Sequence, residues 1–593
     1  MEVPPSTTAS LRAGHLERLY RVGLALGSEP DRDRLVETIL IEAQELTRAD
    51  GGTIYLATGE APPDHAPRAL AFAMFRNDSL GVARGGTTGL PVALPPIPLY
   101  REDGSANHAN IAAFCAHEDR AVNIPDAYDA PGFDFSGTRE FDARHGYRSC
   151  SFLAIPLRGR TCGLLGVLQL INARDERGAV EAFDPERQAI VEALAAQASV
   201  ALENRQLFEG QRELFESFMR LIAGAIDAKS PYTGGHCSRV PVLALMLAQA
   251  ACDATAGPFA GFRLSETEWY ELRVAAWLHD CGKVVTPVHV LDKATKLEAI
   301  HDRIAEVRAR FEILRLEAEV TCLRTILANP AARAVAEQQR LETESALEAE
   351  LAFLTRANIG GESMADEDLA RIRALARREV TIGGVRQPLL SDDEVRHLSI
   401  VRGTLTEDER VIINGHMVQT IEMLRSLPFP PGLRQVPEIA GGHHERMDGR
   451  GYPKGLFAGD MSWPARMMAI ADVFEALTAL DRPYKKPKTL SEAMAIMVAM
   501  KRDNHLDPVV FDLFVTSGTY KRFAVLHMPP ELIDAVDEAA LLAVTPKPFA
   551  LPAEPERLAR RDDYLPAYER LREAWAQAVA RQTPGVGMPD PEA

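Results

Sequence analysis

Two adjacent histidines, His443 and His444, open the chemically most distinctive stretch of this sequence, HHERMDGRGYP over residues 443–453. Neighbouring side chains on one element point in different directions, so two such imidazoles can serve different metal ions or flank a shared one. The Asp-Gly-x-Gly-Tyr-Pro part is typical of a turn, because glycine permits positive φ and proline fixes the exit. The stretch therefore predicts a metal site beside a loop whose backbone can approach a ligand closely.

A second stretch, AAWLHDCGK over residues 275–283, ends an apolar helical run with His279 and Asp280. A carboxylate beside an imidazole is a good ligand pair, and it can bridge two ions. A single histidine is more often a capping or core residue, and Asp472 in its apolar helix has the alternative of a salt bridge to a buried arginine. The combination favours a metal centre, with the candidate ligands His236, His279, Asp280, His416, His443, His444 and Asp472.

Helices are expected to position these ligands. A turn rich in proline and glycine precedes a helix predicted to begin near His236, and His416 is followed by Val418, Ile421 and Leu424 at helical spacing. Asp472 lies in the apolar helical stretch MMAIADVFEAL.

The first part of the chain has a different pattern. We expect a loose leader over residues 1–14, then β-prone runs at 53–57, 151–157 and 163–172, and helix again over 184–205. The third run is almost continuously apolar, which predicts a central strand. Between leader and first strand, two amphipathic helices are predicted from Leu19, Val22, Leu24, Leu26, Leu35, Ile39, Leu40, Ala43 and Leu46.

This order of elements, with the segments ADGGTIYL, NIPDAY, SFLAIPL and GLLGVLQLINA, resembles a GAF domain over residues 15–205. The resemblance implies an α+β sensor domain with a small-molecule pocket, whose ligand the fold does not name. Asn172, Phe183, Asp184 and Glu186 echo the signature of members that bind cyclic nucleotides, although Ala173 replaces its lysine. The ligand stays unknown, and a dimerisation and packing module is the alternative.

Residues 185–229 contain few helix breakers and predict one long helix, of which 206–229 would be a linker to the next domain. Such helices often pair with a second copy, so we expect a parallel homodimer, although the apolar spacing is irregular between Leu207 and Leu214, where Gly210 and Gln211 stand at the place of the intermediate apolar residue of a strict coiled coil.

From about Ile226 to Asp537 the chain resembles the HD-GYP family of metal-dependent phosphodiesterases. Family members are all-helical and hydrolyse cyclic di-GMP, a bacterial second messenger, with two or three metal ions, often iron or manganese. The motifs that carry the resemblance are PYTGGH, HDCGK, GTLTEDERVIINGH, HHERMDGRGYP and ADVFEALTALDRPYKK.

The resemblance implies roles for the candidate residues. Asp280 would bridge two ions, one held with His236, His279 and Asp472 and the other by His416, His443 and His444. Lys283 would face a substrate phosphate, which makes Asp280 and Lys283 the catalytic candidates. Further substrate contacts would come from Gly451, Tyr452, Arg482 and Lys485.

The resemblance also bears on the number of ions. Some members with three metals use a glutamate just ahead of the first histidine, where this chain has Tyr232 and Thr233. We therefore expect two divalent ions, iron or manganese, and not a third.

The stretch between Lys283 and Gly403 is longer than in short members of the family. Apolar residues in steps of three and four, interrupted at Asn329-Pro330, predict an antiparallel helical hairpin over 294–356, and a shorter helix follows near 366–378. The insertion, about 294–400, would be a dimer contact, a lid, a docking arm or a surface elaboration of the 230–540 domain. A tail over 541–593 is expected to contain one helix near 563–581.

Composition limits the other functions. The formal net charge of -18 argues against binding a nucleic-acid polymer, but bound cations would still permit a small phosphate ligand. Seven cysteines without CxxC spacing favour a reducing cytoplasm. The first residues lack a signal-peptide pattern, and the sequence has no apolar run long enough for membrane insertion.

These observations predict a multidomain bacterial signalling protein with an α+β GAF-like sensor domain, a long helical linker and an all-α HD-GYP domain with an inserted helical hairpin. The expected activity is hydrolysis of cyclic di-GMP to linear pGpG, GMP or both, regulated by the GAF domain. The alternatives are hydrolysis of another cyclic dinucleotide or phosphoester, and a module that senses cyclic di-GMP without turnover. The complete ligand set favours catalysis, because inactive relatives would be expected to have lost some of these residues.

Overall fold

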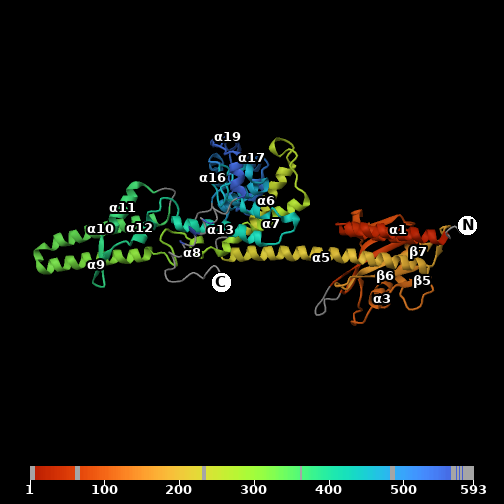
Figure 1. Ribbon diagram of the computed structural model, residues 1–593. Helices are drawn as coiled ribbons and strands as arrows, with labels where there is room; N and C mark the ends of the chain where they lie inside the picture. The colour runs from red at the N-terminus through yellow and green to blue at the C-terminus, as the bar shows by residue number, and fades with distance from the viewer. Residues whose placement is uncertain are drawn as a thin grey trace. The chain divides into compact units, whose positions relative to one another are not determined.

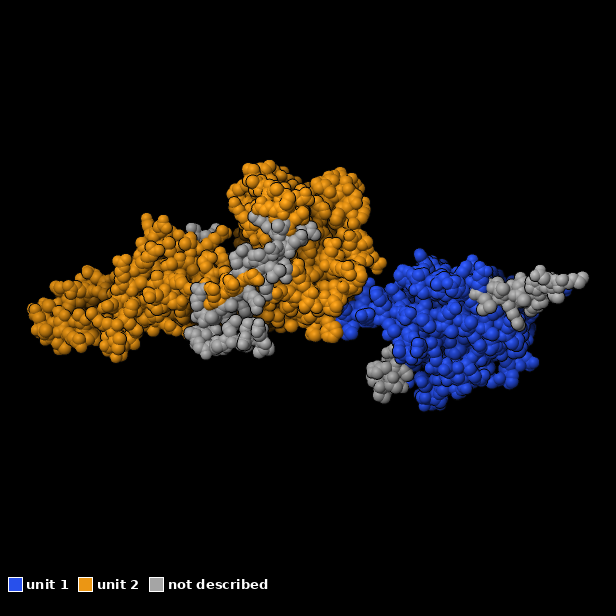
Figure 2. Space-filling view, viewed as in Figure 1, with its two compact units in different colours: residues 1–215 blue, residues 216–593 orange. Residues whose placement is uncertain are grey.

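The computed structural model describes residues 7–59, 67–229, 235–360, 364–480 and 488–562, with single helical positions at 569, 573, 574 and 577. The chain divides into two compact units, residues 1–215 and 216–593 (Figures 1 and 2). Among the described helices, none is both long and apolar enough to cross a membrane.

The first unit is built on one antiparallel sheet with the strand order β3-β2-β1-β7-β6-β5. The predicted central strand is confirmed, because β7 (Leu164–Arg174) pairs with β1 (Ala49–Thr58) on one side and β6 (Phe152–Arg158) on the other. The remaining strands are β2 (Ala69–Asn77), β3 (Val82–Gly85), β4 (Ile97–Pro98), β5 (Val122–Ile124) and β8 (Val180–Glu181).

Helices cover both faces of this sheet. On one face α1 (Thr7–Ser28), α2 (Arg32–Thr47) and the start of α5 (Pro185–Lys229) share a core with β1 and β7. On the other face α3 (Ile111–Glu118) packs over β6 and β7, and α4 (Ser136–His145) follows in the chain (Figure 1). The α+β architecture and the long helix over 185–229 are confirmed.

Two predictions at the N-terminus are wrong. The leader expected over residues 1–14 is helical from Thr7 onward, because the prolines at positions 4 and 5 precede this point and Ala9, Leu11, Arg12 and Ala13 are good helix formers. Leu24, predicted to face the core, is 59% exposed, while Leu19, Val22 and Leu26 are buried.

Asn172 and Phe183, two residues of the cyclic-nucleotide echo, have structural roles. The Asn172 side chain accepts hydrogen bonds from the backbone N–H groups of Cys150 and Ser151 at 2.7 and 3.2 Å, and Phe183 is buried in the core beneath α5. Their contacts account for both residues without a nucleotide.

The second unit consists mainly of helices. Those outside the insertion are α6 (His236–Asp253), α7 (Glu266–Leu278), α8 (Val288–Leu291), α13 (Glu407–Ser426), α14 (Val436–Gly441), α15 (Trp463–Thr478), α16 (Leu490–Arg502), α17 (Pro508–Thr516), α18 (Thr519–His527), α19 (Glu538–Ala543) and α20 (Glu554–Asp562). Much of the predicted tail helix near 563–581 lies outside the described residues; α20 ends at Asp562, just before it.

The inserted hairpin is confirmed, with a later start than predicted. Its helices α9 (Ile304–Ala328) and α10 (Arg333–Asn358) lie side by side, separated by the predicted break at Asn329-Pro330 (Figure 1). Residues 294–303 are irregular instead of helical, and Ile300 is 98% exposed. Asn358 holds this segment through hydrogen bonds to the backbone of Leu297 and the carboxylate of Asp302, which helical periodicity does not reveal.

The insertion also contains α11 (Asp366–Ala376), α12 (Asp392–Leu398) and a two-stranded sheet of β9 (Glu379–Ile382) and β10 (Val385–Pro388). The all-α prediction therefore needs a correction. Gly383 and Gly384, both at positive φ, make the tight turn between the strands.

A buried ion pair fixes the base of the insertion to α13. Lys293 Nζ donates to both carboxylate oxygens of Glu409 at 2.6 and 2.8 Å, and both residues are buried. Glu409 also closes the capping box with Thr406 at the start of α13. Burial by itself would raise the pKa of Glu409, but hydrogen bonds from His397 and Lys293 lower the pKa to about 2.

This pair predicts an acid-sensitive link. The pKa of Glu409 is depressed in the folded state, so its contribution to stability is present above about pH 4.5 and is lost as the pH falls toward 2. Lys293→Met should lower the free energy of unfolding by about 3–5 kcal/mol near neutral pH, because it leaves a buried carboxylate unpaired. Denaturant unfolding at a series of pH values measures both effects.

The double variant Lys293→Met/Glu409→Gln is the control, since its neutral amide can keep the cap without a charge. It should regain much of the lost stability, and equal losses in the single and double variants would contradict the assignment.

Candidate metal centre

The structure brings all seven predicted ligands together as two adjacent groups, from five places in the second unit. The groups are His236, His279, Asp280 and Asp472, and His416, His443 and His444, with the ligand atoms in each group within 4.8 Å of one another. His236 begins α6, His279 and Asp280 follow α7, His416 lies in α13, the histidine pair follows α14, and Asp472 lies in α15.

Asp280 lies between the two groups. Its Oδ2 atom is 3.4 Å from His236 Nε2 and 3.3 Å from His279 Nε2, while its Oδ1 atom is 3.5 Å from His416 Nε2 and 4.0 Å from His443 Nε2. One carboxylate thus presents one oxygen to each group. This is the arrangement required of a carboxylate that bridges two cations.

The imidazoles are held through their Nδ1 atoms. Nδ1 of His279 bonds the Ala276 carbonyl at 2.8 Å, Nδ1 of His443 bonds the Ala440 carbonyl at 2.6 Å, and Nδ1 of His416 bonds the carbonyl three residues before it. A proton on Nδ1 leaves Nε2 as the acceptor that faces the centre.

Several of these inward atoms are buried without a hydrogen-bond partner among the described residues: the Nε2 atoms of His236, His279, His416 and His443, and Asp280 Oδ1. Buried polar atoms are nearly always satisfied, so a converging group of unsatisfied ones calls for a ligand. Imidazole nitrogens and carboxylate oxygens are a donor set that suits divalent transition metals. The residues therefore fit metal ions.

Close packing places Asp280 opposite His416. A Cβ atom on Gly282 would lie 2.0 Å from the His416 carbonyl oxygen, so only glycine permits the residues after α7 to approach α13 this closely. The Gly282 N–H also donates to Thr420 Oγ1 at 3.0 Å. This contact explains the glycine of the HDCGK motif.

The two groups differ in charge. Burial lowers the pKa of His279, but the Asp280 and Asp472 carboxylates outweigh it and raise the pKa to about 9. Burial by itself would raise the pKa of Asp472, but hydrogen bonds from His236 and His279 hold this pKa well below its usual value. In the second group, burial and the neighbouring His279 lower the pKa of His443 to about 4. Protons on histidines thus balance the two carboxylates of the first group, and a bound metal ion would replace these protons, whereas His443 of the second group is neutral, the form that binds metals.

Asp472 lies close to histidines, and not to the buried arginine that was the alternative partner. Its Oδ1 atom lies 3.2 Å from His236 Nε2 and 3.8 Å from His279 Nε2. No arginine pairs with it among the described residues.

Glu475 is a buried carboxylate that the sequence analysis missed. It bonds Nδ1 of His236 and accepts a hydrogen bond from Arg239 Nε at 2.5 Å, and it is 1% exposed. A carboxylate behind a ligand histidine fixes its ring and raises its basicity. The argument applied to Asp472, that a carboxylate in an apolar helix needs a partner, would have found Glu475 three residues later.

The loop over residues 445–456 is organised by a second missed residue, Glu445. Its buried carboxylate accepts hydrogen bonds from the backbone of Lys454 and Leu456 at 2.7 and 2.9 Å, and burial raises its pKa to about 7. Gly451 packs so tightly that a Cβ atom would lie 2.3 Å from the Arg446 nitrogen. The Tyr452 ring stacks on His444 at 4.9 Å between centroids.

The remaining substrate candidates are placed in part. Lys283 Nζ lies 2.5 Å from Asp280 Oδ2, beside the centre, and attraction to Asp280 raises its pKa against the effect of burial. The roles of Lys283, Gly451 and Tyr452 in substrate binding stay predictions. Arg482 and Lys485, like Tyr232 and Thr233, lie outside the described residues.

Comparison with protein families identifies two regions. Residues 31–202 match the family model of the GAF domain and residues 322–510 that of the HD domain. The chain carries a GAF domain followed by an HD domain. The HD match contains His416, His443, His444 and Asp472 but begins after His236, His279 and Asp280, so it is the structure that joins these three to the others.

Three curated relatives match parts of the chain. They are a 3'3'-cGAMP-specific phosphodiesterase of Vibrio cholerae (40% identical over 22% of this chain), a probable cyclic di-GMP phosphodiesterase of the same species (40% over 19%) and a cyclic di-GMP phosphodiesterase of Pseudomonas aeruginosa (38% over 21%). The matched stretches span 29%, 26% and 30% of these relatives.

The contact between Glu475 and His236 predicts an effect on metal affinity. Glu475→Gln keeps the size of the side chain but removes the charge behind the ligand, so Mn²⁺ should bind roughly 10–100-fold more weakly. Calorimetric titration of the metal-free protein with Mn²⁺ measures this.

Glu271→Gln is the matched control, because Glu271 is also buried but accepts hydrogen bonds from the backbone at Gln435 and Val436 and not from a candidate ligand histidine. Equal affinities in the two variants would show that Glu475 has no influence on the ligand histidine.

Proposed function

We propose that this chain is a metal-dependent phosphodiesterase of the bacterial cytoplasm that hydrolyses cyclic di-GMP, and that its GAF domain regulates this activity. The main support for this proposal is the position of Asp280, whose two oxygens face two separate groups of candidate ligands. The names of the relatives support the substrate class.

The two ligand groups support the proposal of two divalent ions, iron or manganese. His236, His279 and Asp472 would hold one, His416, His443 and His444 would hold the other, and Asp280 would bridge them. When bound, paired divalent ions make a water nucleophilic at neutral pH and offset charge on a phosphoryl group.

The residues of the chain contribute binding and position. Lys283, cationic beside Asp280, would pair with a phosphate oxygen of the substrate and move away from the carboxylate to do so. Tyr452, stacked on His444, would limit how the dinucleotide enters. Glu445 holds the loop that carries Gly451 and Tyr452. No covalent nucleophile from the chain is required.

A second candidate substrate is 3'3'-cGAMP, because one relative at 40% identity carries that specificity in its name. The two dinucleotides share the cyclic phosphodiester and differ in one base, so the same centre can act on either. A non-catalytic sensor of cyclic di-GMP stays the alternative from another class. Whether the product is pGpG, GMP or both is decided by following the products in time.

Turnover of both dinucleotides by protein purified without oxygen tests the proposal. The chain with iron or manganese should hydrolyse cyclic di-GMP, and Asp280→Ala should lower turnover by at least about a thousandfold, since the bridging ligand is lost. Asp253→Ala, at the far end of α6, is the control. Tight nucleotide binding without turnover would favour the sensor, and faster hydrolysis of 3'3'-cGAMP would reassign the substrate.

The second unit also shows a connection through which regulation can act. Lys229, the last residue of α5, donates hydrogen bonds from Nζ to the backbone carbonyls of Lys283 and Val284. The helix that continues from the GAF domain thus ends on the segment that carries Lys283. A shift or rotation of α5 would move a residue beside the metal centre.

This link predicts an effect of Lys229→Met. Removing the ammonium group should speed amide hydrogen exchange over residues 281–285 and lower turnover several-fold, because Lys283 is held less firmly. Hydrogen exchange followed by mass spectrometry measures the first effect. Lys521→Met, which removes an ion pair to Glu538 at the surface, is the control; unchanged exchange over 281–285 would remove the link.

The same helix supports a homodimer. Leu207, Leu214, Phe218 and Leu221 are each at least half exposed in this single chain, and their steps of seven, four and three residues form one stripe along α5. Such a stripe is buried when two copies pair in parallel. The homodimer and the unknown GAF ligand are parts of the proposal.

A further inference from the structure

A row of exposed apolar side chains runs along α9, the first helix of the inserted hairpin (Figure 1). Its members are Leu316, Val320, Leu323 and Leu327, which are 52%, 42%, 53% and 83% exposed. The steps of four, three and four residues between them keep these side chains on one side of the helix. We call this set the α9 stripe.

The α9 stripe lies opposite the face through which α9 is buried. The buried residues of this helix are Val307, Phe311, Leu314 and Cys322, and the first three belong to the core that α9 shares with α10. At about 100° per residue, their side chains point away from the stripe. The helix is therefore apolar on two opposite sides, and α10 covers one of them.

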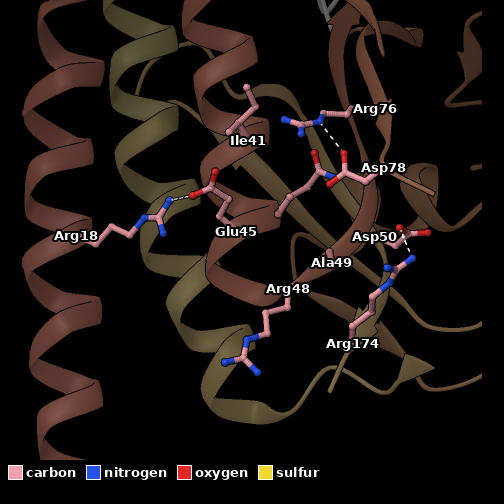
Figure 3. A pocket seen from close by; sticks show the side chains of 10 residues that line it. Arg18, Ile41, Glu45, Arg48, Ala49, Asp50, Arg76, Asp78 and Arg174 are labelled. Atoms are coloured by element: carbon pink, nitrogen blue, oxygen red, sulfur yellow. Dashed lines mark hydrogen bonds and ion pairs between the residues drawn. The ribbon is translucent and has the colours of Figure 1, made fainter. Parts of the chain in front are cut away.

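A row of apolar residues at this spacing is the pattern along which a second helix packs, whereas isolated exposed ones are normal on a surface. Charged surface groups can instead satisfy one another. They do so in the wall of the cavity where α2 meets β1 and β2, where the pairs are Arg18 with Glu45, Arg76 with Asp78, and Arg174 with Asp50 (Figure 3). Leucines have no such option, and only burial against another surface stabilises them.

The charges beside the α9 stripe indicate that this surface is a second copy of the same helix. Glu317 and Arg324 each follow a stripe leucine by one position, so they flank the stripe on the same side, and both are exposed. Neither forms an ion pair within the described part of the chain. When two copies of α9 lie antiparallel about a two-fold axis, Val320 of one meets Leu323 of the other. Glu317 of each copy then faces Arg324 of the other, and the symmetry forms this attraction twice.

The flanking charges also favour one direction of pairing. In a parallel pair, side chains on opposite flanks of the stripe meet, so Glu312 of one copy would approach Glu317 of the other. This repulsion would oppose the attraction between Glu319 and Arg324. The antiparallel pair brings Glu317 to Arg324 and brings no like charges together. The antiparallel direction is therefore the more favourable one.

We propose that two copies of this chain associate through the α9 stripe, with the helices antiparallel and Glu317 of each copy paired with Arg324 of the other. The contact is separate from the pairing of α5, so a chain that makes both contacts forms assemblies larger than a dimer. Its area is at the low end of specific interfaces, which makes the association weak and dependent on concentration. The inference depends neither on the phosphodiesterase proposal nor on the α5 dimer.

Sedimentation equilibrium of the full chain over a wide range of concentrations tests the contact. Leu316→Glu and Leu323→Glu each place a charge in the stripe. Either variant should lower the average mass of the assembly at high concentration by about twofold or more, since one two-fold contact is lost. Leu341→Glu is the matched control, because Leu341 is 52% exposed but lies on α10, outside the stripe, and it should leave the mass unchanged.

Charge reversal tests the antiparallel register. Glu317→Arg should weaken the association by about tenfold, because it places arginines opposite each other in both symmetric contacts. The double variant Glu317→Arg/Arg324→Glu should restore the association, since its attraction is reversed and not removed. Glu348→Arg changes the net charge equally at an exposed position of α10 and is the control.

Four results would overturn the proposal. Equal masses of the parent and the stripe variants at every concentration would leave the stripe to a different protein or to none. An equal loss in Leu341→Glu would show unspecific association of apolar surface. A double variant as weak as Glu317→Arg would remove the proposed pairing of charges, and a stronger association of Glu317→Arg would indicate a parallel pair. None of these results bears on turnover at the metal centre.

Discussion

Two carboxylates with very little exposure, Asp280 and Asp472, impose the constraint that the second unit is built to meet. Burying negative charge is costly unless cations or hydrogen bonds balance it. Here the balance comes from histidines and a lysine supplied by α6, the end of α7, α13 and the residues after α14. Because these elements are distant in sequence, only packing can bring them around the carboxylates. For this reason the metal centre forms only when the helical core packs.

Both local hydrogen bonds and tertiary contacts orient the candidate ligand side chains. Three histidines are oriented by carbonyls three residues earlier on their own elements, so each ring is set before the elements meet. His236 differs, since a carboxylate from α15 fixes its ring. Gly282 then allows the segment carrying Asp280 to dock on α13. The precision of the centre is thus partly a property of single helices and partly of one tight contact.

The insertion separates the two halves of the ligand set in sequence without separating them in space. Residues 294–400 have a core of their own and are attached through the buried Lys293–Glu409 pair at the start of α13. The entropic cost of closing a loop grows slowly with its length, so a long insertion between two fixed ends is little more costly than a short one. The helices on either side of the insertion can therefore keep their positions in the domain. The HD family match begins at residue 322, within this insertion. This agrees with an insertion that separates the segment of His279 and Asp280 from the rest of the domain.

The sequence by itself determined the elements and the chemistry. Helical periodicity placed α5 and α10 close to their observed bounds, and the start of α6 and a helix around His416 were predicted as well. Apolar continuity identified β7 as central, and the residue types of the seven candidate ligands predicted a metal centre. Only the tertiary structure decided that one oxygen of Asp280 faces each group and that Glu475 supports His236. The same limit explains the misplaced start of the hairpin, where Asn358 holds residues 294–303 out of a helix. Periodicity reports which face of an element is buried, whereas these features depend on which distant residue lies opposite, and local sequence does not contain that information.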